Sequence, residues 1–156
     1  MKTEWKKLII AISLPLAVGG VSALLTSGAM QSFESIAKPP LSPPAWLFPV
    51  VWTLLYLLMG VSSYRVWVSP SELAKKQNAL FFYLLQLAFN FLWSLIFFNA
   101  ERYLFAFFWL IGLWVLIYIT ERKFERIDKL SGYLLLPYLV WVAFAGYLNI
   151  GIYFLN

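Results

Sequence analysis

The chain has 156 residues, of which 62% are hydrophobic and 12% are charged, and this is more apolar surface than a soluble domain of that length buries in one core. The sequence contains no Cys and no His, which excludes disulfides, thiol nucleophiles, Cys/His metal sites and a histidine general base. The net charge of +5 comes from basic residues between apolar segments, so it indicates membrane topology and no nucleic-acid partner.

Five segments are apolar over the roughly 20 residues needed to cross about 30 Å of hydrocarbon. They cover roughly 8–27, 45–67, 73–98, 102–121 and 131–154. The sequence therefore predicts an all-α integral membrane protein in which five transmembrane helices form one bundle, with residues 1–156 as a single domain.

The first segment follows three lysines, as a secretory signal would, but its apolar run is long for one. Ser13, Ala17, Gly20 and Ser27 fall on one face of the expected helix, and small residues let helices pack closely. We expect this segment to be retained and that face to pack against other helices.

The connections differ in length. Residues 28–44 form the one long loop, and four prolines stiffen its second half, so it is a candidate lid. Ser69, Pro70, Ser71 and Glu72 read as a capping box at the start of the third helix.

Lysine and arginine are distributed unequally between the two sides. Ten of them precede the first segment or lie between segments two and three and between four and five, whereas the opposite side has only Lys38 and Arg102. By the positive-inside rule, the N-terminus is expected in the cytoplasm and the C-terminus outside.

Rings and uncharged amides recur at helical spacing in three of the segments. In the third, Gln86, Asn90, Trp93 and Phe97 form one stripe, and in the fifth, Pro137, Trp141, Phe144 and Leu148 form another. With the expected topology, both stripes lie in the outer half of the membrane. Trp46, Phe48, Trp52 and Tyr56 begin the second segment at the same level, directly after the long loop.

These three stretches predict an aromatic-lined cavity beneath the 28–44 loop, with Asn90 and indole N–H groups as its few polar contacts. Each feature has a structural alternative. Trp46 lies near a span end and suits the aromatic belt of a membrane protein equally well. Asn90 and Asn149 are amides that could join helices; we favour a ligand contact for Asn90 and an interhelical bond for Asn149.

The sequence argues against several kinds of chemistry. No charged residue lies deep in any span, which disfavours ion-coupled transport. The chain shows no paired carboxylates, serine triad or phosphate-binding loop, and we expect no metal and no resident cofactor. Any reaction would have to use aromatic side chains and the ligand itself.

The three stretches, their order and their place in five spans resemble the translocator protein family, also called tryptophan-rich sensory proteins or peripheral-type benzodiazepine receptors. The quoted residues are Pro43 to Gly60, Gln86 to Phe98, and Pro137 to Asn149. The resemblance implies a homodimer in the lipid bilayer that binds protoporphyrin IX or a related tetrapyrrole, and synthetic isoquinoline carboxamide and benzodiazepine ligands. It implies pocket positions at Ala23, Thr26, Trp52, Asn90, Trp93, Trp141, Phe144, Ala145 and Leu148.

The leading expectation is a receptor in a bacterial plasma membrane. The alternative is an enzyme that degrades protoporphyrin in light and oxygen, with Trp52 and Trp141 as catalytic residues; a further alternative is a porphyrin transporter or a stress-response regulator. Animal relatives carry a sterol-recognition pattern that ends in a basic residue after the last helix. Here no Lys or Arg follows Lys129, so we do not expect high-affinity cholesterol binding.

Overall fold

The structure is a computed structural model that describes residues 2–156, and in these residues it is helical, without a strand. Its elements are α1 (Trp5–Thr26), the 3-10 turn η1 (Ser27–Ala29), α2 (Met30–Ser35), α3 (Leu47–Val68), α4 (Leu73–Ser94), the π-helical turn η2 (Leu95–Asn99), α5 (Tyr103–Ile127), α6 (Lys129–Tyr133) and α7 (Leu136–Leu155).

Five helical stretches in the described residues are long and apolar enough to cross a membrane, which confirms the expected fold class. They are Trp5–Ser35, Leu47–Val68, Leu73–Asn99, Tyr103–Ile127 and Lys129–Leu155. In each, the apolar side chains that are not buried in the bundle are available to face lipid.

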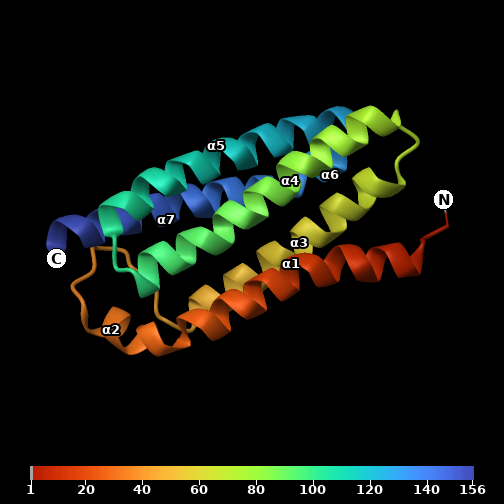
Figure 1. Cartoon of the computed structure of the whole chain (residues 1–156). Coiled ribbons are helices and arrows are strands. Elements are labelled where there is room, and N and C mark those ends of the chain that lie inside the picture. Colours follow the sequence, from red (N-terminus) through yellow and green to blue (C-terminus); the bar gives the residue numbers. More distant parts are fainter. Residues whose placement is uncertain (1) are drawn as a thin grey trace.

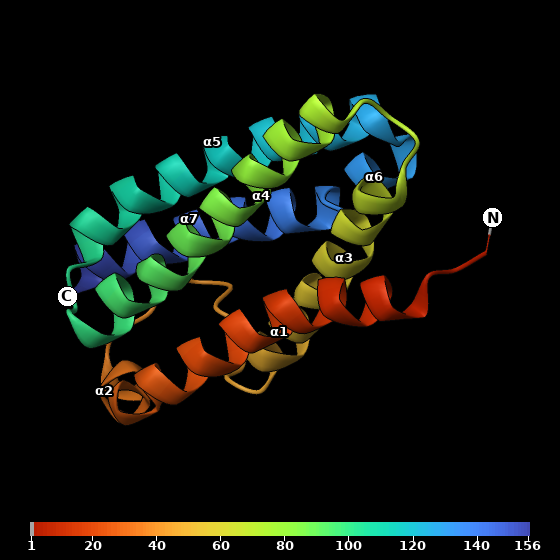
Figure 2. The ribbon, with the colours of Figure 1, turned by 45° about the vertical axis from the view of Figure 1, so that its right-hand side comes forward.

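The long helices run side by side, with α5 packed against both α4 and α7, and α1 packed along α3 (Figures 1 and 2). The N-terminus, the α3–α4 turn and the α5–α6 connection lie at one end. The C-terminus, the α4–α5 hairpin and α2 lie at the other (Figure 1). Ten of the twelve Lys and Arg residues belong to the first end, so the unequal distribution seen in the sequence is also a separation in space.

A glycine brings α1 and α3 together. A Cβ placed on Gly60 would lie 2.6 Å from the Cα of Ile12, so the two backbones meet at a distance that no other residue permits. Beside this contact α1 buries Ala11 and Pro15. Within the bundle, the predicted packing face of α1 is not the inward one: Ser13, Ala17, Gly20 and Ser27 are exposed. The inward face is instead set by Gly60 and by a hydrogen bond between the Ser22 and Ser94 hydroxyls, which are 2.5 Å apart.

The first half of the 28–44 segment is helical and not an open loop. Here η1 and α2 keep the backbone helical as far as Ser35, with α2 at an angle to α1 (Figure 2), and the Ser27 hydroxyl donates to the Leu24 carbonyl. No proline interrupts residues 27–35, so nothing prevents this continuation. The extended part, residues 36–46, contains all four prolines, and we call it the lid.

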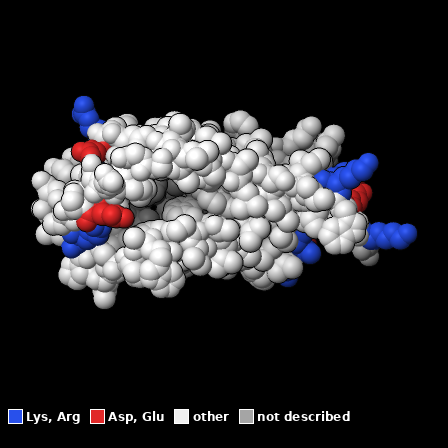
Figure 3. Space-filling view, turned by 90° about the horizontal axis from the view of Figure 1, so that it is seen from below, with Lys and Arg blue, Asp and Glu red and all other residues white. Residues whose placement is uncertain are grey.

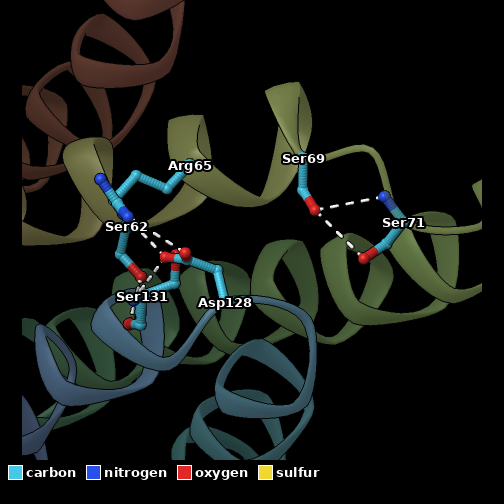
Figure 4. A network of polar contacts seen from close by, with 6 residues as sticks. All are labelled: Ser62, Arg65, Ser69, Ser71, Asp128 and Ser131. Atoms are coloured by element: carbon cyan, nitrogen blue, oxygen red, sulfur yellow. Dashed lines mark hydrogen bonds and ion pairs between the residues drawn. The ribbon is translucent and has the colours of Figure 1, made fainter. Parts of the chain in front are cut away.

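An ion pair joins α3 to the short helix α6 at the basic end (Figure 4). The Arg65 guanidinium donates twice to the Asp128 carboxylate, at 2.7 and 3.0 Å. Asp128 also caps α6 by accepting from the backbone N–H and hydroxyl of Ser131. Arg65, and then these Ser131 bonds, hold the pKa of the Asp128 carboxyl below its usual value.

Replacing Asp128 separates its two contributions. Asp128→Asn keeps a capping oxygen but removes the charge, and should reduce the free energy of unfolding by about 1 kcal/mol or less, since both side chains are partly exposed. Asp128→Ala removes the cap as well and should cost about 1–2 kcal/mol. Denaturant unfolding followed by circular dichroism measures both.

The pH dependence of these variants follows from the lowered pKa of Asp128. A carboxyl with a depressed folded pKa contributes its full stabilisation above the unfolded pKa of about 4 and loses it as the pH falls through the folded value. The stability difference between the wild type and Asp128→Asn should therefore be constant above about pH 5 and shrink below about pH 4. A difference that stayed constant through acid pH would contradict the role of the charge.

The start of α4 differs from the predicted capping box. The helix begins at Leu73, and Glu72 makes no side-chain capping bond. The Ser69 hydroxyl oxygen instead accepts from the Ser71 N–H at 3.2 Å, which closes a tight turn around Pro70 (Figure 4). The first-turn N–H groups of α4 therefore lack a side-chain cap.

Candidate functional site

A chain of polar side chains crosses the bundle interior between α3, α4 and α7. Tyr56 donates to the Asn90 carbonyl oxygen at 3.2 Å, and Asn90 donates to the Tyr138 hydroxyl at 2.7 Å. Tyr138 in turn donates to the Gln86 carbonyl oxygen at 2.7 Å. All four side chains are buried. In an apolar interior such groups are costly unless paired, and here they pair with one another.

A second polar pair lies closer to the lid end of the bundle. The Trp93 indole N–H donates to the Asn149 carbonyl oxygen at 3.1 Å, and Asn149 donates to the backbone carbonyl of Tyr103 at 2.8 Å. These bonds connect α4, α5 and α7, so Asn149 joins helices as the sequence suggested. Trp93 also stacks on Phe97, with 5.2 Å between ring centroids.

Rings fill the space between α3 and α7. Phe48 meets the face of Trp141 edge-on at 5.9 Å, and Trp141 contacts Phe144 at 5.6 Å. Trp52 stacks on Tyr56 at 5.7 Å and meets Tyr138 edge-on at 6.2 Å. We call Phe48, Trp52, Trp141 and Phe144 the aromatic wall; all four are partly exposed.

One polar atom of the aromatic wall lacks a partner. The indole nitrogen of Trp141 is buried and makes no hydrogen bond to any described residue. Within residues 2–156, only the Tyr83 hydroxyl shares this property, and Tyr83 packs against Phe124 toward the basic end. An unpaired buried N–H is uncommon in a folded protein and is a place where a ligand acceptor would be favoured.

The lid is fastened to α7 over this end of the molecule. The Asn156 side chain accepts from the Ala37 N–H at 3.2 Å and donates to the Ala37 carbonyl at 2.8 Å. Tyr147 donates to the Pro40 carbonyl at 2.7 Å. Pro39 is buried against Gly151, where a Cβ would lie 2.7 Å from the proline ring. The surface seen in Figure 3 is hollowed at the end that carries α2 and the lid.

Helix α2 is held down by an aromatic contact that the sequence analysis did not identify. Phe33 meets Phe97 at 5.9 Å and Phe98 at 5.1 Å, both of which belong to η2. In the π-helical turn, the Ala100 N–H donates a hydrogen bond to the carbonyl of Leu95, five residues back. An isolated Phe in a polar stretch gives no periodic signal, so this contact could not be read from the sequence.

The structure brings most of the predicted site residues together. Asn90, Trp93, Phe97, Ala145 and Leu148 are all buried in the bundle; Asn90 adjoins the aromatic wall through Tyr56, whereas Trp93 and Phe97 contact each other, Asn149 and Tyr103. Three residues are separate from this group. Trp46 is 67% exposed, Ala23 is on the outer side of α1, and the hydroxyl of buried Thr26 donates to the Ser22 carbonyl of its own helix. The exposure of Trp46 is that of a membrane-interface residue.

Asn90 has both of its amide atoms in hydrogen bonds within the protein. Its interhelical role is therefore the one present in this structure, and a ligand contact would require one of these bonds to open. Tyr138 lies in the third predicted stretch, but the sequence analysis did not name it as a ligand-binding residue. The signal was a phenol directly after Pro137, on the same helix face that buries Ala145.

The two cations at this end lie at the rim. Lys38 donates to the Glu34 and Ile36 carbonyls and lies 4.8 Å above the Phe33 ring, so it closes the end of α2. Arg102 lines an open depression of about 880 Å³ at the surface, together with Glu101, Tyr153 and Asn156. Within the described residues, no group of His, Cys, Asp and Glu could hold a metal ion.

Fold and site together define a multi-pass membrane protein of five helices whose aromatic interior is closed at one end by an ordered lid. The TspO/MBR family pattern matches residues 11–155. The chain belongs to this family.

Similar proteins are known from bacteria and animals. The chain is 36% identical to the tryptophan-rich protein TspO of Chlorobaculum tepidum over all of its own length and 99% of that protein. It is 38% identical to the protein CrtK of Rhodobacter capsulatus over 88% of its length and 85% of that protein. It is 32% identical to the translocator protein of Bos taurus, over 96% and 89% of the two chains.

Proposed function

We propose that this protein is a membrane receptor that binds a tetrapyrrole such as protoporphyrin IX against the aromatic wall, beneath the lid. The observation that carries the proposal is the buried, unpartnered indole N–H of Trp141. Around it the wall supplies apolar faces for a macrocycle, while the neighbouring amides and phenols are already paired. A carboxylate or carbonyl oxygen of a ligand would supply the missing acceptor. An isoquinoline carboxamide or a benzodiazepine carries such an oxygen on an aromatic frame.

Trp141→Phe tests this proposal. An aromatic ring, although a smaller one, remains at the position and the donor is removed, so the affinity for protoporphyrin IX should fall about three- to tenfold, the worth of one hydrogen bond. Absorbance and tryptophan-fluorescence titrations in darkness measure it. The matched control is Trp114→Phe, because the Trp114 indole donates to the Leu139 carbonyl and does not belong to the aromatic wall. Equal affinity of the wild type and Trp141→Phe would contradict the contact, and the absence of saturable binding would contradict the receptor.

The same titration under illumination examines the alternative of an enzyme that degrades the bound porphyrin. Trp52 and Trp141 both belong to the aromatic wall, which would bring either indole against a bound macrocycle. Protein-dependent formation of a new absorbing product in light and oxygen, lost in Trp141→Phe while binding is retained, would favour the enzyme. Binding without such a product leaves a receptor.

We also propose that the basic end faces the cytoplasm of a bacterial cell and the lid faces outward, because ten Lys and Arg residues lie at the first end and two at the second. The chain has no cysteine, so single cysteines report topology directly. Ser32→Cys in α2 should react with a membrane-impermeant maleimide in intact spheroplasts, and Gln77→Cys in α4 only after lysis. Both positions are exposed. The reverse pattern would invert the topology.

A homodimer is the proposed assembly. The exposed face of α1 supports it, because Ser13, Ala17 and Gly20 form a strip of small residues there, and no atom lies within 4 Å of a Cβ placed on Gly20. A second helix could approach this backbone closely.

A further inference from the structure

A groove at the basic end gathers cations that have no strong internal partner. It has a volume of about 470 Å³ and lies between the start of α4 and the end of α5. Ser71, Glu72, Lys75, Asn78, Lys123, Arg126 and Ile127 line it. We call this surface the basic groove. The lining contains three cations and one carboxylate, so it carries a net charge of +2.

The pairing of these cations distinguishes them from others at the same end. Arg65 is neutralised by Asp128, Arg122 by Glu125, and Lys7 by Glu4, each at 2.7 to 2.8 Å. In the basic groove, Lys75 lies 4.0 Å from Glu72, with both side chains about 70% exposed. Such a pair is weak in water. Arg126 makes no salt bridge or side-chain hydrogen bond within residues 2–156.

The remaining features of the groove also favour an anion. The uncapped first turn of α4 lies beside Ser71 and Glu72, and its N–H groups carry the positive end of the helix dipole. The Ser71 hydroxyl and the Asn78 amide add hydrogen-bonding groups to the lining. The ligand chemistry that fits is a phosphate with its negative charge and several acceptor oxygens.

Apolar surface continues from the groove into the span. Lys123 lies 5.1 Å above the ring of Phe82, two turns along α4 from Lys75. Beyond it on the same side, Phe82 itself is partly exposed, and Val115, three turns from Arg126 along α5, is exposed to the surroundings of the bundle. A molecule with a phosphate in the groove would therefore place its next atoms along this apolar surface, at the level where a membrane span ends.

We propose that the basic groove binds the headgroup phosphate of an anionic phospholipid, whose acyl chains lie along α4 and α5. The cations and the uncapped N-terminus of α4 match the phosphate of such a lipid. The adjoining apolar surface matches its acyl chains. This site is at the opposite end of the bundle from the aromatic wall, so it does not depend on the proposed function.

The test uses the full chain in micelles or nanodiscs of phosphatidylcholine, titrated with phosphatidylglycerol and followed by native mass spectrometry and the thermal unfolding midpoint. The wild type should retain phosphatidylglycerol at least about tenfold more strongly than phosphatidylcholine, and Lys123→Gln/Arg126→Gln should lose most of this preference. The matched control is Lys6→Gln/Lys129→Gln, which removes the same charge from exposed positions at the same end but outside the groove.

Each outcome decides the proposal. A lipid site is supported if the preference for phosphatidylglycerol is lost only in Lys123→Gln/Arg126→Gln, with unchanged helicity. The charge-conserving variant Arg126→Lys should keep the preference. An equal loss in the control variant means that only the overall charge of this end attracts the lipid, and overturns the proposal. Competition by excess inorganic phosphate, with saturation in the absence of lipid, would assign the groove to a soluble anion and overturn it as well.

Discussion

Gly151→Ala should open the lid and make protoporphyrin IX dissociate about tenfold faster or more. The added Cβ would lie 2.7 Å from two atoms of the Pro39 ring, so the lid has to move away from α7. That movement breaks the pair of hydrogen bonds between Asn156 and Ala37 and the bond from Tyr147 to Pro40, each worth about 0.5–1.5 kcal/mol. Alanine favours a helix over glycine, so α7 itself should remain intact.

Two readouts separate the lid from the ligand. A spin label on Ala45→Cys, an exposed position within the lid, reports lid movement without any ligand, and stopped-flow fluorescence reports the dissociation rate. Gly146→Ala is the control on the same helix, because its Cβ would meet Leu110 and Phe107 at ordinary contact distances of 3.8 and 3.9 Å. If the label moves and the rate does not, the lid does not gate the ligand; if neither changes, the contact of Pro39 with Gly151 does not hold the lid.

The second large effect concerns stability. Gly60→Ala should lower the free energy of unfolding by about 2–3 kcal/mol, because the added methyl group would lie 2.6 Å from the Ile12 Cα and 3.1 Å from the Ala11 carbonyl oxygen. These are backbone atoms, so no side-chain rotation relieves the collision, and α1 must separate from α3. Unfolding in a graded series of denaturing detergent measures the change.

Gly112→Ala is the matched control for Gly60→Ala. Both residues lie within long helices, but a Cβ on Gly112 would meet only the Phe89 ring, at an ordinary contact distance of 3.7 Å. This variant should be neutral or more stable by up to about 1 kcal/mol, since alanine has the higher helix propensity. Equal destabilisation by both substitutions would show that glycine flexibility, and not the close approach of two backbones, is what matters at position 60.

Features set by local composition could be predicted from the sequence. The five spans follow from long apolar runs, and the spacing of Asn90, Trp93 and Phe97 placed these side chains on one face of the helix formed by α4 and η2, where all three are buried. Periodicity, however, does not identify a neighbour. The strip of Ser13, Ala17 and Gly20 has the spacing of a packing face, yet the inward side of α1 is determined by Gly60 on another helix.

The polar interior was only partly predictable for a similar reason. The sequence shows that Gln86, Asn90 and Tyr138 lie within spans and need partners, but it does not show that they become each other's partners. An amide left for a ligand and an amide bonded across helices give the same pattern. Likewise, Asn156 is a single polar residue at the end of an apolar helix. Its two hydrogen bonds to Ala37 join residues that are 119 positions apart.

The paired polar chain and the aromatic wall have different roles, and this difference bears on how such a protein can evolve. Tyr56, Asn90, Tyr138 and Gln86 satisfy one another, so they hold three helices together whether or not a ligand is present. Phe48 and Phe144 contribute rings near the lid but no hydrogen bond to the bundle. On the proposed function, substitutions at these two positions would change the choice of ligand across a lineage, while the polar chain preserves the architecture.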